Sequence, residues 1–246
     1  HYPLRRQRQM CIRDRDNFAK HLQKVGYETA MIGKIHLRGL PQGFDYSAVL
    51  PGQGHYYNPD FIIDGIKKRI NGYVTSITTN LALDWLKNKR KKDQPFLLLY
   101  HQKAPHRNWK PEEKYLSLFD DKTFDPPANF FDDYSNRGTA AKTQEMLIAA
   151  SEKQIEVAHG NGGHGRWGHD FKMLKDPYGN NTGFERELKR FSPEQKSAWL
   201  DAYTPKNEAM ISQNLEGKEL ALWKFNRYIK DYLRTIQSVD DGVGEV

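Results

Sequence analysis

The chain has 246 residues, and its 38 Lys and Arg against 31 Asp and Glu give a formal net charge of +7. With 37% hydrophobic and 12% aromatic residues it can bury the core of one ordinary domain or one large α/β domain, which excludes a disordered chain. A single cysteine excludes an internal disulfide framework and a thiolate metal cluster, and no run of about 18 apolar residues could span a membrane. The basic surplus favours an anionic partner without specifying nucleic acid.

Residues 1–15 differ from the rest of the chain. They include no initiator Met at position 1 and no apolar segment of a signal peptide, and five arginines recur among them. We expect this segment to be a non-native leader; a basic arm that binds a polyanion is the alternative. Residues 16–246 are expected to form the folded part.

A short helix followed by a strand is predicted first. Phe18, Leu22 and Val25 share one face of a helix that Gly26 would end, and residues 29–32 are typical of a buried strand that Gly33 would stop.

The same order recurs further along the chain. Residues 75–89 have helical spacing, and the apolar run of residues 96–100 predicts a strand covered on both faces. Helix followed by buried strand, twice, predicts a parallel sheet with helical crossovers.

The remaining segments are predicted to be loops and one long helix. Residues 41–60, 120–136 and 159–170 are rich in Gly, Pro, Asp or Asn and are expected to be loops. Residues 218–243 predict a helix with one apolar face, formed by Leu222, Ile229, Leu233, Ile236, Val239 and Val243. Because a helix there would normally lead into a further strand, we expect an α/β domain that is incomplete at both ends.

Cationic and imidazole side chains follow both predicted strands. Lys34 and His36 come after the first, and Lys103, His106 and Arg107 come after the second. Ligands of open α/β sheets bind outside the carboxyl ends of the strands, so neighbouring strands would bring these groups together. A sulfate or phosphate would use Lys as a point charge and His as donor and general acid. Solvated loops without a function fit the spacing equally well.

At these positions the sequence resembles a known family. Residues 26–37 are similar to the second signature of type I sulfatases, with Ile35 in place of the usual Trp, and residues 93–106 are similar to that family's strand and active-site His loop. Shorter similar segments lie at residues 84–86, 131–134, 205–208 and 228–241. Residues 51–60 are most similar to sulfatases that remove the 6-sulfate of N-acetylglucosamine in mucin or glycosaminoglycan chains.

The resemblance implies an alkaline-phosphatase-like α/β fold, with a mostly parallel sheet and flanking helices. It implies that Lys34 contacts a sulfate oxygen and the ester oxygen, that His36 hydrogen-bonds a hydrated formylglycine nucleophile, and that His106 binds the sulfate and protonates the leaving sugar oxygen. His55 and Asn58 would contact the substrate. A sulfated carbohydrate would be the partner, with neither nucleic acid nor a membrane span, and the location would be secreted or periplasmic.

Two parts of that family's active site are missing from the sequence. The formylglycine arises in a Cys-x-Pro-Ser-Arg motif, whereas Cys11 is followed by Ile-Arg-Asp-Arg. The Asp and Asn ligands of Ca²⁺ would lie outside this chain, and Asp240 and Asp241 on the last predicted helix do not replace them. We therefore expect no metal site here and no activity from this chain alone.

Other interpretations stay open at this stage. A phosphomonoester or phosphodiester hydrolase of the same superfamily would share the oxyanion chemistry, and a non-catalytic module could bind polyanions through the basic surface. Residues 87–92 could be a solvated helix end or a guide for a sulfated polymer. Trp109, Tyr56 and Tyr57 could stack on sugars or pack inside the fold. His159, His164 and His169 could bind a metal or belong to a loop.

Overall fold

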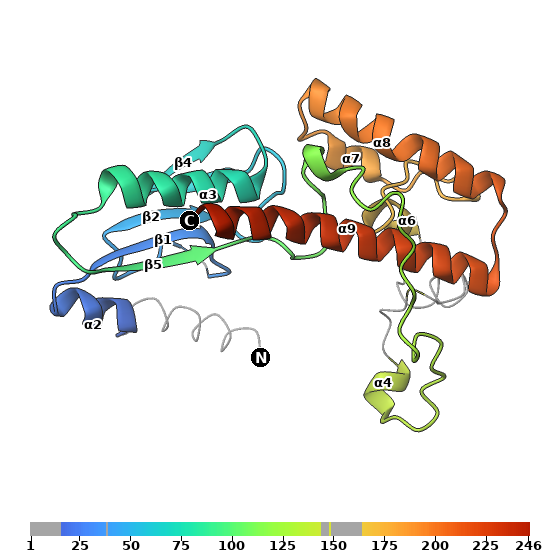
Figure 1. The fold of residues 1–246 in the computed structure, drawn as a ribbon, viewed down its shortest axis with the longest axis horizontal. Helices are drawn as coiled ribbons and strands as arrows, with labels where there is room; N and C mark the ends of the chain where they lie inside the picture. Colours follow the sequence, from blue (N-terminus) through green and yellow to red (C-terminus); the bar gives the residue numbers. More distant parts are fainter. Residues whose placement is uncertain (1–15, 38, 144–147, 149–163) are drawn as a thin grey trace. The chain divides into compact units, whose positions relative to one another are not determined.

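The structure is a computed structural model that describes residues 16–37, 39–143, 148 and 164–246 (Figure 1). These form two compact units: residues up to Arg107 together with Ile236–Val246, and Asn108–Thr235. The predictions made for residues 1–15, which include Cys11, and for His159 lie outside the described residues.

The first unit is built on a five-stranded mixed sheet in the order β4-β3-β2-β1-β5. Its strands are β1 (Glu28–Lys34), β2 (Tyr46–Leu50), β3 (Asp60–Ile63), β4 (Ile66–Arg69) and β5 (Phe96–His101). The central strand β1 pairs in parallel with β2 and β5, whereas β3 and β4 add an antiparallel hairpin beside β2. The α/β architecture is thus confirmed, with a hairpin that the sequence pattern did not reveal.

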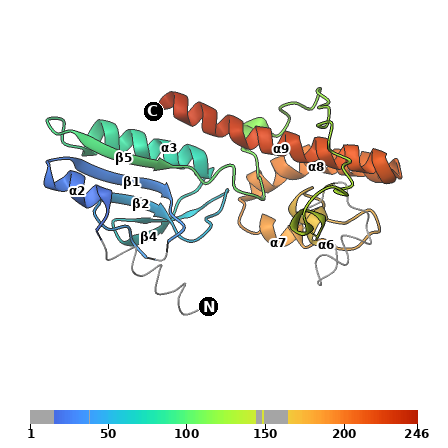
Figure 2. The ribbon, with the colours of Figure 1, turned by 90° about the horizontal axis from the view of Figure 1, so that it is seen from below.

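Helix α3 (Val74–Asp84) and the π-helical turn η1 (Trp85–Lys89) cover one face of this sheet, as Figures 1 and 2 show. Ala82 and Trp85 pack there against Ala30, Ile32 and Ala48. Alternate residues of the strands face the other way, and they form a second cluster around Met31, Ile35 and Val49. The predicted helix over residues 75–89 is confirmed.

Two local predictions for this unit were wrong, those for residues 41–60 and for the strand over residues 96–100, whereas the first predicted helix is confirmed. Residues 41–60, expected to be a loop, contain β2, whose side chains are almost all buried between flanking Gly and Pro residues. Helix α2 (Phe18–Lys24) forms, but Phe18 and Val25 are 57% and 70% exposed and only Ala19 is buried. Strand β5 is half-buried, not covered on both faces, because it is an edge strand of this sheet.

The second unit is mainly helical. It contains η2 (Glu113–Tyr115), α4 (Thr139–Thr143), α6 (His164–His169), α7 (Phe184–Leu188), α8 (Pro193–Ser212) and most of α9 (Gly217–Glu245). Residues 164–169 were expected to be loop and are helical, whereas residues 120–136 are turns, as predicted. Helix α8 begins with a capping box in which Ser192 and Gln195 bond each other's backbone N–H.

The long helix α9 confirms the prediction for residues 218–243, but a different face of it is buried. The predicted apolar face is half-buried, and Val243 is 59% exposed. The buried positions are instead mostly polar or charged: Lys224, Arg227, Asp231, Arg234, Thr235 and Ser238. Apolar spacing alone missed this face because buried charges are tolerated where they are paired.

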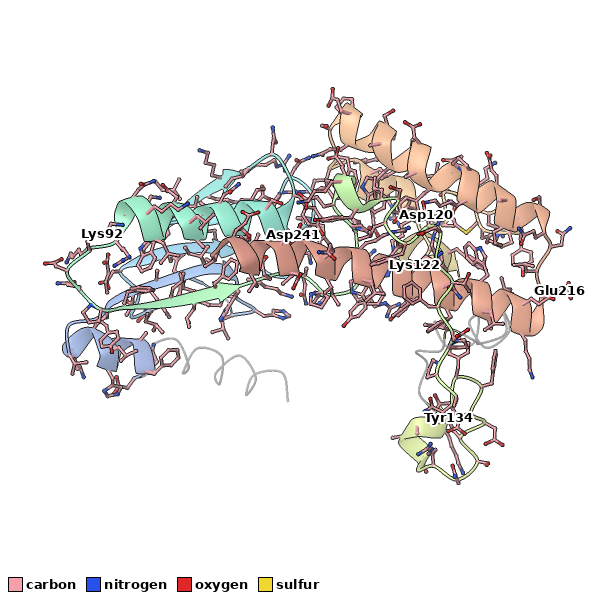
Figure 3. The ribbon with its side chains drawn as sticks, viewed as in Figure 1. Lys92, Asp120, Lys122, Tyr134, Glu216 and Asp241 are labelled. Carbon is pink, nitrogen blue, oxygen red and sulfur yellow. The ribbon has the colours of Figure 1, made fainter. Side chains whose placement is uncertain are left out.

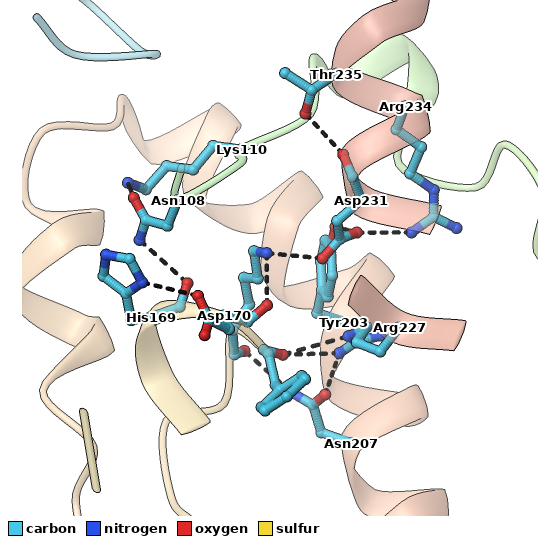
Figure 4. Close-up of polar contacts among 12 residues, drawn as sticks. Asn108, Lys110, His169, Asp170, Tyr203, Asn207, Arg227, Asp231, Arg234 and Thr235 are labelled. Carbon is cyan, nitrogen blue, oxygen red and sulfur yellow. Dashed lines mark hydrogen bonds and ion pairs between the residues drawn. The ribbon is translucent and has the colours of Figure 1, made fainter. Parts of the chain in front are cut away.

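Those pairs centre on Asp231, which is fully buried (Figure 4). Its carboxylate forms ion pairs with Lys172 Nζ at 2.8 Å and Arg234 Nη1 at 3.0 Å, and it accepts a hydrogen bond from the Tyr203 hydroxyl at 2.6 Å. Arg227 donates to the carbonyl oxygen of Phe171 and to the side chain of Asn207. The network therefore joins α8 and α9 to the segment around residue 172.

Candidate active site

The candidate site lies in the first unit, where three strands end. Strands β2, β1 and β5 run in parallel, so their carboxyl ends meet at one edge of the sheet (Figure 1). Lys34 is the last residue of β1, Gln53 follows β2, and Lys103 and His106 follow β5. The two clusters that the sequence singled out are thus on neighbouring strands.

Gly33 lets these strands approach closely. Gly33 was expected to stop β1, but the strand continues through it, and Gly33 pairs in register with His101. Its φ is +109°, and a Cβ placed there would lie 1.8 Å from the carbonyl oxygen of His101. Because only glycine fits that space, Gly33 brings Lys34 beside the loop that carries His106.

Gln53 bridges the two predicted site residues of the first cluster. Lys34 Nζ donates to Gln53 Oε1 at 2.6 Å, and Gln53 Nε2 lies 3.4 Å from His36 Nε2. His36 itself is exposed. Lys34 and His36 therefore both face the side-chain amide of Gln53 at the carboxyl ends of the strands.

Lys103 ties the second cluster to the same loop. It is only 6% exposed, its Nζ donates to the carbonyl oxygen of Gln53 at 3.0 Å, and it lies over the Tyr56 ring at 4.6 Å. The Tyr56 hydroxyl donates to the carbonyl oxygen of His106 at 2.6 Å. His106 Nδ1 contacts the carbonyl oxygen of Arg107. These bonds hold the loops after β2 and β5 together.

Burial is the main cause of the lowered pKa values in the site, and neighbouring positive charges add to it at His106. Burial lowers the pKa of Lys34. Burial also lowers the pKa of His106, and the charges of Lys34, Lys103 and His36 lower it further, against an opposing effect of the Arg107 carbonyl. His106 is therefore biased toward the neutral form, and a bound anion would favour its protonation.

Two other predicted residues lie in the loop after β2, with different surroundings. His55 is exposed, two positions after Gln53. Asn58 is 6% exposed, and its side-chain oxygen accepts from the backbone N–H of Gly72 at 2.8 Å. That bond, together with the φ of +47° at Asn58, gives its side chain a part in shaping the loop.

A cavity of about 390 Å³ opens beside His36. Its lining is mainly apolar and comes from the ends of β1 and β2, with Ile35, Leu37, Val49 and Leu50 among the wall residues. His36 thus borders on space in which a ligand larger than a sulfate could lie.

The structure gives the surroundings of the other features that the sequence left open. Tyr56, Tyr57 and Trp109 are buried and pack against other aromatic rings. Residues 87–92 form a largely exposed helix end, where Lys89 pairs with Asp84 at 3.0 Å. His169, whose ring Nδ1 lies 3.0 Å from Asp170 Oδ1, belongs to α6.

Neither a metal site nor a membrane span is evident in the described part of the chain. No group of three or more His, Cys, Asp or Glu side chains among those residues could hold a metal ion. Asp240 and Asp241 lie on α9, as expected, and Asp241 accepts from Gln237 at 3.0 Å. No helix within the described ranges is long and apolar enough to cross a membrane.

Sequence reasoning missed Gln53 as the partner of Lys34 and did not distinguish Lys103 from its neighbours. Both lie inside segments that carried the family resemblance, at residues 51–60 and 93–106. A sequence motif identifies the segments that belong to the site. The contacts between their side chains depend on how the loops after β1, β2 and β5 meet.

The fold is that of an α/β protein with a ligand-binding edge at the carboxyl ends of its parallel strands, and the cations gathered there suit an oxyanion. The chain belongs to the sulfatase family, whose model matches residues 11–246. It is 41% identical, over 95% of its length, to an N-acetylglucosamine-6-O-sulfatase of Bacteroides thetaiotaomicron. It also superposes, with a TM-score of 0.81 and 40% identity over 94% of its length, on the structure of a protein in complex with its substrate D-glucosamine-2-N,6-O-disulfate. The chain spans 40% of the first relative and 45% of the second.

Proposed function

We propose that the protein carrying this chain hydrolyses the sulfate ester of a sulfated carbohydrate, with 6-sulfated N-acetylglucosamine of mucin or glycosaminoglycan as the substrate. The observation that carries the proposal is the meeting of Lys34, His36, Lys103 and His106 around the Gln53 loop. Family membership and the names of the two relatives support the same reaction.

Lys34 and His106 have complementary tasks in this proposal. The ammonium of Lys34 neutralises charge on a sulfate oxygen and on the ester oxygen. The bond between sulfur and the ester oxygen breaks, and His106 gives a proton to that oxygen, so that the sugar leaves as an alcohol. Water supplies the oxygen that ends in the released sulfate. The anionic substrate offsets the surrounding cations and so helps His106 to carry the proton.

In the sulfatase family a hydrated formylglycine supplies the nucleophile and Ca²⁺ stabilises charge. The described residues offer no ligand set for Ca²⁺, and Cys11 lacks the Pro and Ser of the formylglycine motif. We propose that the protein uses both groups, as other members of the family do. His36 would then hydrogen-bond the formylglycine, and His55 and Asn58 would contribute to the substrate-binding loop.

The location of the substrate suggests the location of the protein. Sulfated glycans of this class lie outside the cytoplasm, so we propose a secreted or periplasmic protein. Fractionation of cells that express it would test this, and recovery in the cytoplasmic fraction alone would contradict it.

The decisive experiment compares hydrolysis of the 6-sulfate and the 6-phosphate of N-acetylglucosamine by the protein that carries this chain. We expect a preference for the sulfate, and a loss of roughly 10²-fold or more in kcat/KM in Lys34→Ala and His106→Ala. Lys87→Ala, which removes an exposed charge from the helix end, should retain activity.

Other outcomes would identify the rivals. Preference for the phosphate would assign the site to a phosphohydrolase. Binding of sulfated polymers without hydrolysis, unaffected by Lys34→Ala, would indicate a polyanion-binding module.

A further inference from the structure

A second group of cations lines a cavity inside the second unit. The cavity measures about 290 Å³, near the lower end of the roughly 300–1,000 Å³ typical of ligand pockets. Lys206 from α8 and Arg227, Lys230 and Arg234 from α9 line it together with Asp120, and Trp223 forms part of the wall. Figure 4 shows Arg227 and Arg234 on α9, and Figure 3 labels Asp120 in the segment beside that helix.

Hydrogen bonds with α9 hold the segment on one side of this cavity in place. Arg234 Nε donates to the carbonyl oxygen of Leu118 at 2.7 Å. Asn226 accepts from the backbone N–H of Phe124 at 2.8 Å and donates to its carbonyl oxygen at 3.2 Å. The segment of residues 116–124 is thus held against α9, which gives the cavity a fixed lining.

Asp120 is the carboxylate that lines the cavity beside four cations, and Asp231 and Asp121 also act on these cations from outside the lining. Asp120 is engaged by Lys206 and by Arg234, each at 2.6 Å. Arg227 donates to a carbonyl oxygen and to Asn207, groups that carry no charge. Among the described residues no hydrogen-bond or ion-pair partner reaches the ammonium of Lys230. The cavity therefore has a surplus of positive charge with at least one ammonium available.

The lowered pKa values of two lysines in the cavity agree with this surplus of positive charge. Burial lowers the pKa of Lys206 and of Lys230, and the positive charges of Arg234 and Arg227 lower both further, while Asp120 acts in the opposite direction. A bound anion would relieve that repulsion.

We propose that this cavity is a second oxyanion site that takes a sulfate group, either as the free ion or as an ester on a sugar. Lys230 would donate to the sulfate oxygens. Lys206, which already donates to the Leu116 carbonyl oxygen and to Asp120, would add positive potential together with Arg227 and Arg234. The site uses none of the residues assigned to hydrolysis, so it stands or fails separately from the proposed function.

The test is a titration of this chain with sodium sulfate at constant ionic strength, followed by NMR of the ¹⁵N-labelled tryptophan side chains. Trp223 reports locally on the cavity, and Trp223→Phe identifies its signal among those of the five tryptophans. We expect a saturable shift of the Trp223 indole signal. N-acetylglucosamine 6-sulfate is titrated in a second arm, and the tighter ligand identifies the source of the sulfate group.

Three variants make the test specific. Lys230→Gln should weaken binding by roughly tenfold or more, because a hydrogen bond to a charged group is lost. Lys218→Gln removes a charge from the same helix outside the cavity and should leave binding unchanged, as should Lys34→Met. No saturable shift with either ligand, or equal weakening in Lys218→Gln and Lys230→Gln, or loss of the shift in Lys34→Met, would overturn the proposal.

Discussion

At the scale of single residues, two demands on the candidate active site oppose each other: His106 must be protonated, and the cations around it disfavour its protonation. His106 has to carry a proton to serve as general acid, yet Lys34, Lys103 and His36 all oppose it. Lys103 is the least exposed of these groups and is held by the Gln53 carbonyl and the Tyr56 ring. We therefore expect a larger fraction of His106 to be protonated when an anion is bound than when the site is empty.

The first prediction concerns this balance. Lys34→Met and Lys103→Met should each raise the pKa of His106, because each removes a neighbouring positive charge. NMR titration of the His106 ring measures the change, and saturating sulfate should raise the same pKa in the unmodified chain. Lys87→Met is the matched control and should leave the pKa where it is. A pKa that stays constant in both site variants would show that the charges do not act on His106.

The second prediction concerns the glycine between the two strands. Gly33→Ala should destabilise the fold by more than about 1 kcal/mol, because the new Cβ meets the His101 carbonyl. Denaturant unfolding measures the loss. Gly26→Ala is the control, since Gly26 also has a positive φ, of +87°, but has open space around its Cα. Equal losses in the two variants would mean that backbone strain, and not the contact with β5, explains the effect.

At the scale of elements, the two longest helices are joined through buried charge. Burial alone would raise the pKa of Asp231, but Lys172, Arg227 and Arg234 outweigh it and hold that pKa below its ordinary value. Lys172 is fully buried too, and burial lowers its pKa against the attraction of Asp231. Lys172 and Asp231 therefore each stabilise the charged form of the other.

The third prediction follows from this dependence. Asp231→Asn should destabilise the protein by about 3–5 kcal/mol, because it leaves Lys172 buried beside a neutral group. Asp240→Asn, at an exposed position of the same helix, should cost little. Thermal or denaturant unfolding separates the two variants. A loss below about 1 kcal/mol in Asp231→Asn would contradict the structural role of the network.

The same network predicts the response to acid. Since the pKa of Asp231 is lowered in the folded state, its contribution is present above the ordinary Asp pKa of about 3.9 and is lost as the pH falls through the folded-state value. The stability difference between the original chain and Asp231→Asn should therefore shrink in that acidic range.

At the scale of the whole molecule, the chain combines a cationic candidate site with an absence of metal-binding groups among the described residues. It spans 40% and 45% of the two relatives. We expect the calcium ligands of the proposed function to be distributed outside the described residues.

The fourth prediction tests that distribution. Millimolar Ca²⁺ or an excess of EDTA should leave the Tm of this chain unchanged, because a ligand that binds the folded state would raise it. Differential scanning calorimetry with Mg²⁺ as the control gives the measurement. A rise in Tm with Ca²⁺ but not with Mg²⁺ would place calcium ligands within these 246 residues.

The sequence by itself determined the helix-and-strand order over residues 18–34 and 75–101, the long helix α9, and the two clusters that flank the candidate site. Local spacing was sufficient there because the apolar periods are long and the cations follow the strands directly. It did not determine β2 or the buried face of α9. Short strands between Gly and Pro residues have too few positions for a period. The burial of Arg234 and Asp231 depends on partners that are distant in the sequence, Asp120 and Lys172 respectively. The tertiary structure also decided that Gln53 joins Lys34 to His36, since that contact requires the segments after β1 and β2 to meet at one edge of the sheet.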